Sequence, residues 1–232
     1  MRTFLLAAAA AACLLAAPAG AATRNFGITS FTKVRVDGPF NVSLATGVAP
    51  FARASGSQAA IDRVAVEVQG DTLVVHNDIN GWGDYSGKDV GPVEISLGTH
   101  DLSAAWLNGS GALSIDRAKG LSFNLSVQGS GIADIDRADV DQLNVSVVGT
   151  ASATLGGRAG KTTAVVRGVS TLDAANLASK DATIGAEGTA KVAANVSNSV
   201  TVDASGPATV SLTGSPACTL RVSGSASVSG CR

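Results

Sequence analysis

Three aspartates, Asp116, Asp134 and Asp136, are the residues of this sequence best placed for acid–base chemistry. Asp116 and Asp136 hold equivalent positions in an internal repeat, and each is followed by an arginine. If the repeats stack as neighbouring strands, these two carboxylates lie about 4.8 Å apart and could share a Ca²⁺ ion or serve a polysaccharide-active enzyme as acid and base. The same position continues with Gly156 and Ala175, so no long acidic groove is expected. A solvated ladder in which Asp and Arg offset each other is the favoured interpretation.

A second candidate site is the segment NDINGWGDYSGKDVGP, residues 77–92, which combines loop-forming glycines with aromatic and acidic side chains. Trp82 and Tyr85 could stack on a sugar beside Asp78 and Asp84, because loops on rigid scaffolds often carry binding residues. The segment loosely resembles a calcium loop, but Trp82 occupies what would be a ligand position and no acidic residue closes the set, so no metal site is predicted. The alternative, which is favoured, is that the loop covers the outward-facing Trp106.

The remaining polar motifs do not predict catalysis. The repeated Gly-Ser-Gly runs are followed by strands, whereas a phosphate-binding loop opens a helix. The two histidines, His76 and His100, sit in no recognisable serine, acid and base arrangement. With 17 basic and 18 acidic side chains and no basic cluster, the sequence lacks the electrostatic signature of nucleic-acid binding. No enzyme activity, cofactor or nucleic-acid partner is therefore expected.

The candidate residues are positioned by a repeat of 18 to 20 residues. Each repeat contains the glycine of a small-residue turn, and apolar residues alternate with polar ones on both sides of it, as in half-buried strands. The residues two and four places before the glycine are apolar, as are nearly all of those four and six places after it, and the residue two places after it is small. The turn glycines are Gly109, Gly129, Gly149, Gly168, Gly188, Gly206 and Gly224.

The repeat predicts the fold. One repeat cannot bury its inner face alone, but stacked repeats align each apolar position into a continuous core. Equivalent strands in such a stack are parallel, and crossover chirality favours a right-handed coil. We therefore expect an all-β, right-handed parallel β-helix or solenoid with rungs of about 18–20 residues. Residues 22–232 form one domain, with an irregular capping end at 24–100 and regular rungs at 101–232, and one apolar residue in each polar linker could pack under a third short face.

The two ends of the chain carry further signals. Residues 1–21 read as a secretory signal peptide, with Arg2, an apolar run and a cleavage site after Ala21. No later segment approaches the roughly 18 consecutive apolar residues of a membrane span, and lipidation at Cys13 is the less favoured alternative. The chain is expected to be exported, to the periplasm, the cell surface or the medium. Cys218 and Cys231 flank the last turn almost symmetrically, which predicts a disulfide that closes the final rung.

Several segments in order resemble a known family. FTKVRVDGPFNVSLATG, VAVEVQGDTLVVHN, VEISLGTHDLSAAWLNGSGALSID and repeated V-x-G-S-G units are similar to the bacterial family described as "putative auto-transporter adhesin, head GIN domain". The resemblance covers essentially the whole mature chain. It implies a β-helical extracytoplasmic domain with no established catalytic residues.

The expected function is binding rather than catalysis. The first hypothesis is a non-enzymatic, extracytoplasmic, adhesin-like binding or scaffold domain that contacts an envelope glycan or a surface protein through its outer faces. The alternatives are a polysaccharide-active enzyme that uses Asp116, Asp134 and Asp136, and a structural component of the envelope. The ligand and the oligomeric state stay open.

Overall fold

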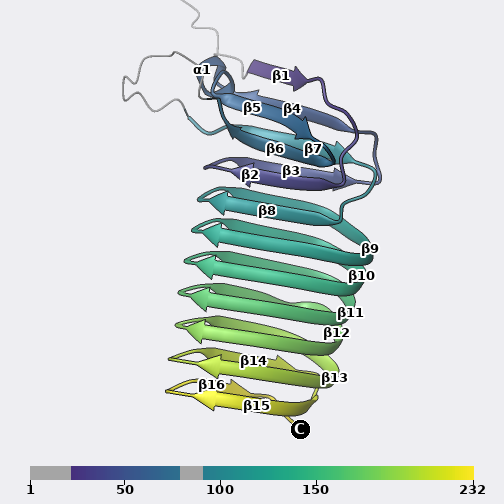
Figure 1. The fold of residues 1–232 in the computed structure, drawn as a ribbon. Helices are drawn as coiled ribbons and strands as arrows, with labels where there is room; N and C mark the ends of the chain where they lie inside the picture. Colours follow the sequence, from purple (N-terminus) through teal and green to yellow (C-terminus); the bar gives the residue numbers. More distant parts are fainter. Residues whose placement is uncertain (1–21, 79–90) are drawn as a thin grey trace, which may run out of the picture.

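The chain coils into a stack of parallel rungs (Figure 1). The computed structural model describes residues 22–78 and 91–232. Its regular part consists of long strands that each wind through most of a rung and pair in parallel with the next. These strands are β9 (Ala112–Gly129), β10 (Ile132–Gly149), β11 (Ser152–Gly168), β12 (Thr171–Gly188) and β13 (Lys191–Ser205). The predicted all-β parallel solenoid is confirmed.

The turn glycines are in register from rung to rung, as the repeat predicts. Gly129 pairs with both Gly109 and Gly149, and Gly168 pairs with Gly149 and Gly188. Gly129 has a φ of +105°, and a Cβ there would lie 2.7 Å from the carbonyl oxygen of Gly109. The backbone conformation and the spacing between rungs therefore both favour glycine at this corner.

The apolar positions around each glycine form the core. The residues two and four places before the turn glycine are buried in every rung from the Gly109 turn to the Gly206 turn. They belong to one continuous hydrophobic cluster. In the final rung, Leu220 and Val222 are 44% and 47% exposed, because their strand pairs with β13 alone among the described strands. The buried members are Ala105, Leu125, Val145, Ala164, Ile184, Val202 and Leu107, Val127, Val147, Val166, Ala186, Ala204.

The linkers form a third short face, as expected. One apolar residue of each linker is buried beneath it, and polar side chains surround that residue. Register shifts between neighbouring rungs, such as the one between Ile135 and Ala138, let linkers of different length share this face. The buried residues are Ala118, Ala138, Ala159, Leu177, Val196 and Pro216.

Two faces of the stack carry the sites discussed below. The first, named the Trp106 face, contains β5 (Val64–Gln69), β6 (Thr72–Asn77), β2 (Lys33–Asp37), β8 (Ala104–Gly109) and the second half of each long strand. The second, named the Phe51 face, contains β1 (Ala22–Phe26), β4 (Phe51–Gly56), β7 (Glu94–Thr99), β3 (Asn41–Thr46) and the first half of each long strand. The core lies between them.

The order of the rungs differs from their order in the sequence. The rung made by β2 and β3 stacks directly on the rung made by β8 and β9. The intervening strands β4 to β7, with the short helix α1 (Gln58–Ile61), lie above it (Figure 1). Pairing there becomes mixed, because β4 is antiparallel to β1 and β7, and β5 is antiparallel to β6.

The other end of the stack is formed by β14 (Thr209–Thr213), β15 (Ala217–Ser223) and β16 (Ser227–Ser229). Cys218 in β15 and Cys231 form a disulfide with a Cα–Cα distance of 5.7 Å, which confirms the predicted pair. Within residues 22–78 and 91–232, no helix is long and apolar enough to cross a membrane.

Candidate functional site

The aromatic loop predicted from the sequence lies mostly outside the described residues. Trp82, Asp84 and Tyr85 belong to the segment 79–90, so the structure does not test that prediction. Asp78 follows β6, and its backbone N–H donates a hydrogen bond of 2.8 Å to the carbonyl oxygen of Arg63. Residues 1–21, with Cys13, also lie outside the described part.

The three aspartates do not form one site. Asp116 and Asp136 border the same small cleft on the Phe51 face, whereas Asp134 lies in a neighbouring outward column between Ser114 and Thr154. Asp116 Oδ1 accepts hydrogen bonds from the backbone N–H of Thr46 at 2.9 Å and from its hydroxyl at 3.2 Å. Asp116 therefore ties two rungs together.

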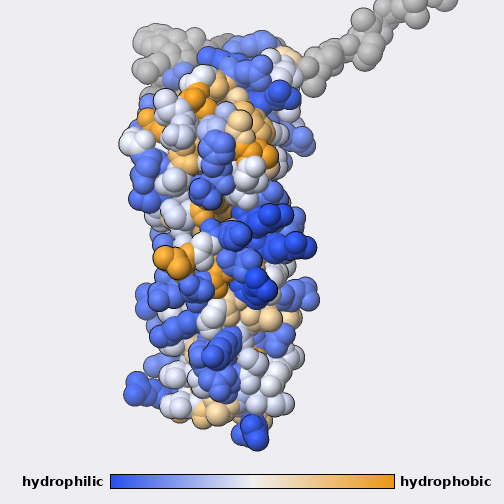
Figure 2. Space-filling view, turned by 90° about the vertical axis from the view of Figure 1, so that its right-hand side faces the viewer, coloured by the Kyte–Doolittle hydropathy of each residue, from blue (hydrophilic) through white to orange (hydrophobic). Residues whose placement is uncertain are grey.

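Charged side chains line the third face, where Arg117 and Arg137 are opposite each other in register. Figure 2 shows this side of the stack, with strongly hydrophilic side chains gathered over its middle rungs. Arg158 forms an ion pair of 2.7 Å with Asp139 on the neighbouring rung. Its hydrogen bond, with further attraction from Lys119 and Arg117, holds the pKa of Asp139 below its ordinary value. Solvent screens these exposed charges, so the ion pair contributes little to the free energy of unfolding.

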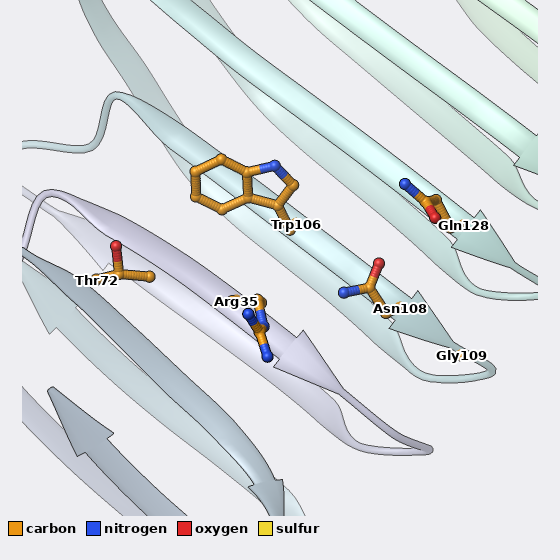
Figure 3. A pocket seen from close by; sticks show the side chains of 6 residues that line it. All are labelled: Arg35, Thr72, Trp106, Asn108, Gly109 and Gln128. Atoms are coloured by element: carbon orange, nitrogen blue, oxygen red, sulfur yellow. The ribbon is translucent and has the colours of Figure 1, made fainter. Parts of the chain in front are cut away.

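A larger hollow lies on the Trp106 face. It has a volume of about 710 Å³ and is lined by residues of four strands, β6, β2, β8 and β9 (Figure 3). Arg35 and Trp106 are directly opposite each other in register, as are Asn108 and Gln128. We name this hollow the Trp106 groove, and its lining residues are Arg35, Thr72, Trp106, Asn108, Gly109 and Gln128.

The indole of Trp106 lies along the sheet. Figure 3 shows the ring pointing back toward the start of β8, away from Asn108 and Gln128. Ala104 faces the same side two residues earlier and is only 3% exposed. We infer that the ring covers this small side chain, which gives the groove a flat apolar floor.

Polar groups beside the indole are held in fixed positions. Arg35 donates to Asp37 Oδ2 at 2.7 Å, and Asn108 Nδ2 donates to Asp37 Oδ1 at 2.7 Å. A guanidinium has five N–H donors and an amide also has an acceptor oxygen, so Arg35 and Asn108 both keep groups for a ligand. Because Asp37 orients them, little side-chain entropy is lost when a ligand binds.

A titratable pair adjoins the groove. His76 Nε2 lies 2.9 Å from Glu67 Oε1, and His76 Nδ1 lies 2.9 Å from the carbonyl oxygen of Asn77. Both partners are acceptors, so both contacts are hydrogen bonds only when the ring carries two protons. The hydrogen bond to Glu67 is the largest cause that raises the pKa of His76, and the same bond lowers the pKa of Glu67.

The groove has the chemistry of a binding site. A flat indole beside guanidinium and amide groups matches a ligand with an apolar ring face and a hydroxyl rim, such as a sugar. Among the described residues, no group of three or more His, Cys, Asp or Glu side chains could hold a metal ion. The sequence identifies Trp106 as outward-facing but does not pair it with Arg35, because that pairing depends on the placement of the β2 rung.

The comparisons with known proteins agree on family and fold. The family model described as "Putative auto-transporter adhesin, head GIN domain" matches residues 30–216. No curated protein matches the chain.

Three similar solved structures come from Bacteroides and Parabacteroides species. A protein from Bacteroides fragilis described as a putative adhesin has a TM-score of 0.78 at 18% identity, with 90% of this chain and 95% of that chain covered. One from Parabacteroides distasonis described as a putative lipid binding protein has a TM-score of 0.73 at 16% identity, covering 91% and 96%. A putative adhesin from the same species has a TM-score of 0.66 at 14% identity, covering 90% and 96%. At these identities the likeness shows the fold alone.

Proposed function

Because this chain belongs to the family described as "putative auto-transporter adhesin, head GIN domain", we propose that it is an exported, non-catalytic binding domain whose Trp106 groove holds a carbohydrate of a cell envelope or cell surface. The observation that carries the proposal is the indole of Trp106 lying along the sheet in a hollow that also contains Arg35 and Asn108, both held by hydrogen bonds to Asp37. A sugar ring presents C–H groups to the indole and hydroxyl groups to the polar side chains.

Export is supported by two features. The sequence of residues 1–21 has the pattern of a secretory signal, and the Cys218–Cys231 disulfide is typical of an oxidising compartment. Fractionation of cells that express the full chain tests this part of the proposal. We expect the processed, disulfide-bonded protein outside the cytoplasm, and a reduced, unprocessed cytoplasmic protein would contradict it.

Binding without catalysis is supported by the placement of the aspartates. Asp116 and Asp136 face the same small cleft, but Asp134 lies in a separate column, so the three aspartates do not form one acid–base site. Asp116 also accepts two hydrogen bonds from Thr46 and is thereby held in the framework.

The test of the groove is a glycan array probed with residues 22–232 and with the Trp106→Ala variant. We expect the variant to bind at least tenfold more weakly, because truncation removes the apolar floor of the groove. Leu121→Ala is the matched control, since it removes a 79% exposed apolar side chain from a different place. The double variant Trp82→Ala, Tyr85→Ala tests the loop in parallel. Equal binding by the parent protein and Trp106→Ala would overturn the groove.

Tryptophan fluorescence supplies a direct readout of the same contact. The chain has only two tryptophans, so Trp82→Phe leaves Trp106 as the single reporter. A bound sugar from the array should change the emission of this variant. An unchanged spectrum at saturating sugar would place the ligand elsewhere.

A further inference from the structure

The Phe51 face carries a second hollow that the Trp106 groove does not explain. It has a volume of about 220 Å³, which is below the roughly 300–1,000 Å³ of sites for drug-sized ligands. We name it the Phe51 cleft. The lining residues that matter are Ser43, Phe51, Ser96, Ser114, Asp116 and Asp136, from strands β3, β4, β7, β9 and the neighbouring rung.

The ring of Phe51 rests on the backbone of a neighbouring strand. Phe51 pairs in register with Gly98 in β7, and a Cβ at Gly98 would lie 2.3 and 2.4 Å from two ring atoms. Only glycine therefore leaves room for the ring in this position. Phe51 is still 40% exposed, so it does more than cover the glycine: part of its surface is presented to solvent beside the cleft.

The other walls of the cleft are polar and aligned. Ser43 pairs in register with both Ser96 and Ser114, which places three hydroxyl groups in one column. Ser43 Oγ donates to Ser96 Oγ at 3.4 Å. Asp116 is fixed by Thr46, and the exposed Asp136 follows it on the next rung. The cleft thus offers an aromatic face at one side and carboxylate and hydroxyl groups at the other.

We propose that the Phe51 cleft is a second carbohydrate site, which takes a single neutral sugar ring. One face of the sugar stacks on Phe51, and Oδ2 of Asp116, the carboxylate oxygen that does not bind Thr46, accepts a hydrogen bond from a sugar hydroxyl. The sugar is neutral because Asp116 and Asp136 repel an anionic one. The small volume restricts the site to one ring rather than an extended chain. This site lies on the opposite face from the Trp106 groove and does not depend on it.

The experiment is a backbone amide NMR titration of residues 22–232 with four probes: glucose, galactose, mannose and N-acetylglucosamine. At least one sugar should shift the amide signals of Ser96 and Gly98 in a saturable way. Phe51→Ala and Asp116→Asn should each weaken that binding at least tenfold, and Trp106→Ala should leave it unchanged. Gly98→Ala, which displaces the ring without removing it, should weaken binding as well.

Two controls keep the outcome interpretable. Leu121→Ala removes an exposed apolar side chain elsewhere and should bind like the parent. If Phe51→Ala disturbs the fold, as a general loss of amide dispersion would show, Asp116→Asn decides, since the amide oxygen of asparagine can still accept the hydrogen bonds of Thr46. The proposal is overturned if none of the four sugars shifts Ser96 and Gly98, or if the shifts persist in Asp116→Asn. Loss of array binding by Trp106→Ala bears only on the groove.

Discussion

At the scale of single residues, two glycines with positive φ distinguish the cost of a steric clash from the cost of backbone strain alone. Gly129 and Gly120 both have positive φ, +105° and +146°, but a Cβ at Gly129 would meet the Gly109 carbonyl whereas a Cβ at Gly120 would meet nothing within 4 Å. Gly120→Ala should therefore cost only the strain, about 1–3 kcal/mol. Gly129→Ala should cost more, because the rungs must also move apart. Thermal unfolding of the two variants measures the difference, and equal melting temperatures would refute it.

His76 and Glu67 give stability a pH dependence. The raised pKa of His76 means that its contribution is full below the ordinary value of 6.5 and is lost as the pH rises through the folded-state value. The lowered pKa of Glu67 means that its contribution is full above the ordinary value of 4.5 and is lost as the pH falls through the folded-state value. The pair is thus fully formed between about pH 4.5 and 6.5.

The expected result is a pH-dependent difference between the parent and His76→Gln. The parent should have the higher melting temperature at pH 5.5, and the two proteins should converge at pH 9. His100→Gln, which removes the other histidine and leaves the His76–Glu67 pair in place, is the matched control. An equal difference in melting temperature between the parent and His76→Gln at both pH values would mean that the ion pair does not contribute to stability.

At the scale of elements, the inward and outward columns should respond differently to charge. Leu125 is 2% exposed in the core column, while the next residue, Ser126, points outward. Leu125→Ala should cost about 2–5 kcal/mol, and Leu125→Asp should cost more because it also buries a carboxylate. Ser126→Asp should change stability by less than about 1 kcal/mol. Circular dichroism during chemical unfolding tests this, and equal tolerance of both aspartates would show that the columns are wrongly assigned.

The elements could be predicted from the sequence where the repeat shows which residues face the core, and could not be predicted where the repeat is absent. The long strands repeat the same alternation every rung, so Val127, Ala133 and Ile135 are assigned to the core from sequence, and the structure buries them. The mixed end has no repeat to fix its register. The position of β2 between β6 and β8 therefore could not be predicted from the sequence, and neither could the pairing of Arg35 with Trp106. The Phe51 cleft is missed for the same reason, since it forms where β4 runs back along β7.

At the scale of the whole molecule, stability is expected to be shared between neighbouring rungs rather than spread through one compact core. Each rung contacts mainly its neighbours, as in other solenoids. A substitution in one rung should therefore destabilise that rung and its neighbours more than distant rungs. The Cys218–Cys231 disulfide joins two residues that are 13 positions apart in the sequence, for which the chain-entropy model gives about 3 kcal/mol.

Reduction of the disulfide should therefore loosen the final rung first. Hydrogen exchange followed by mass spectrometry should show faster exchange in β15 and β16 and little change in β9 to β11. Cys218→Ser, Cys231→Ser should reproduce the effect without reductant. A uniform rise in exchange along the whole stack would instead indicate a single cooperative unit.

The antiparallel strands at the mixed end also bear on self-assembly. A stack of identical parallel rungs is a template for fibre growth, because another chain can add its strands in the same direction and extend the ladder. Here β4 reverses direction on β7, and β1, the outermost described strand of that face, presents the exposed Arg24 and Asn25. An incoming parallel rung meets strands of the wrong polarity and a charged edge. Because β4 runs antiparallel to β7, the parallel strands of another chain cannot continue the ladder at this end. Fibril growth from this end is therefore disfavoured.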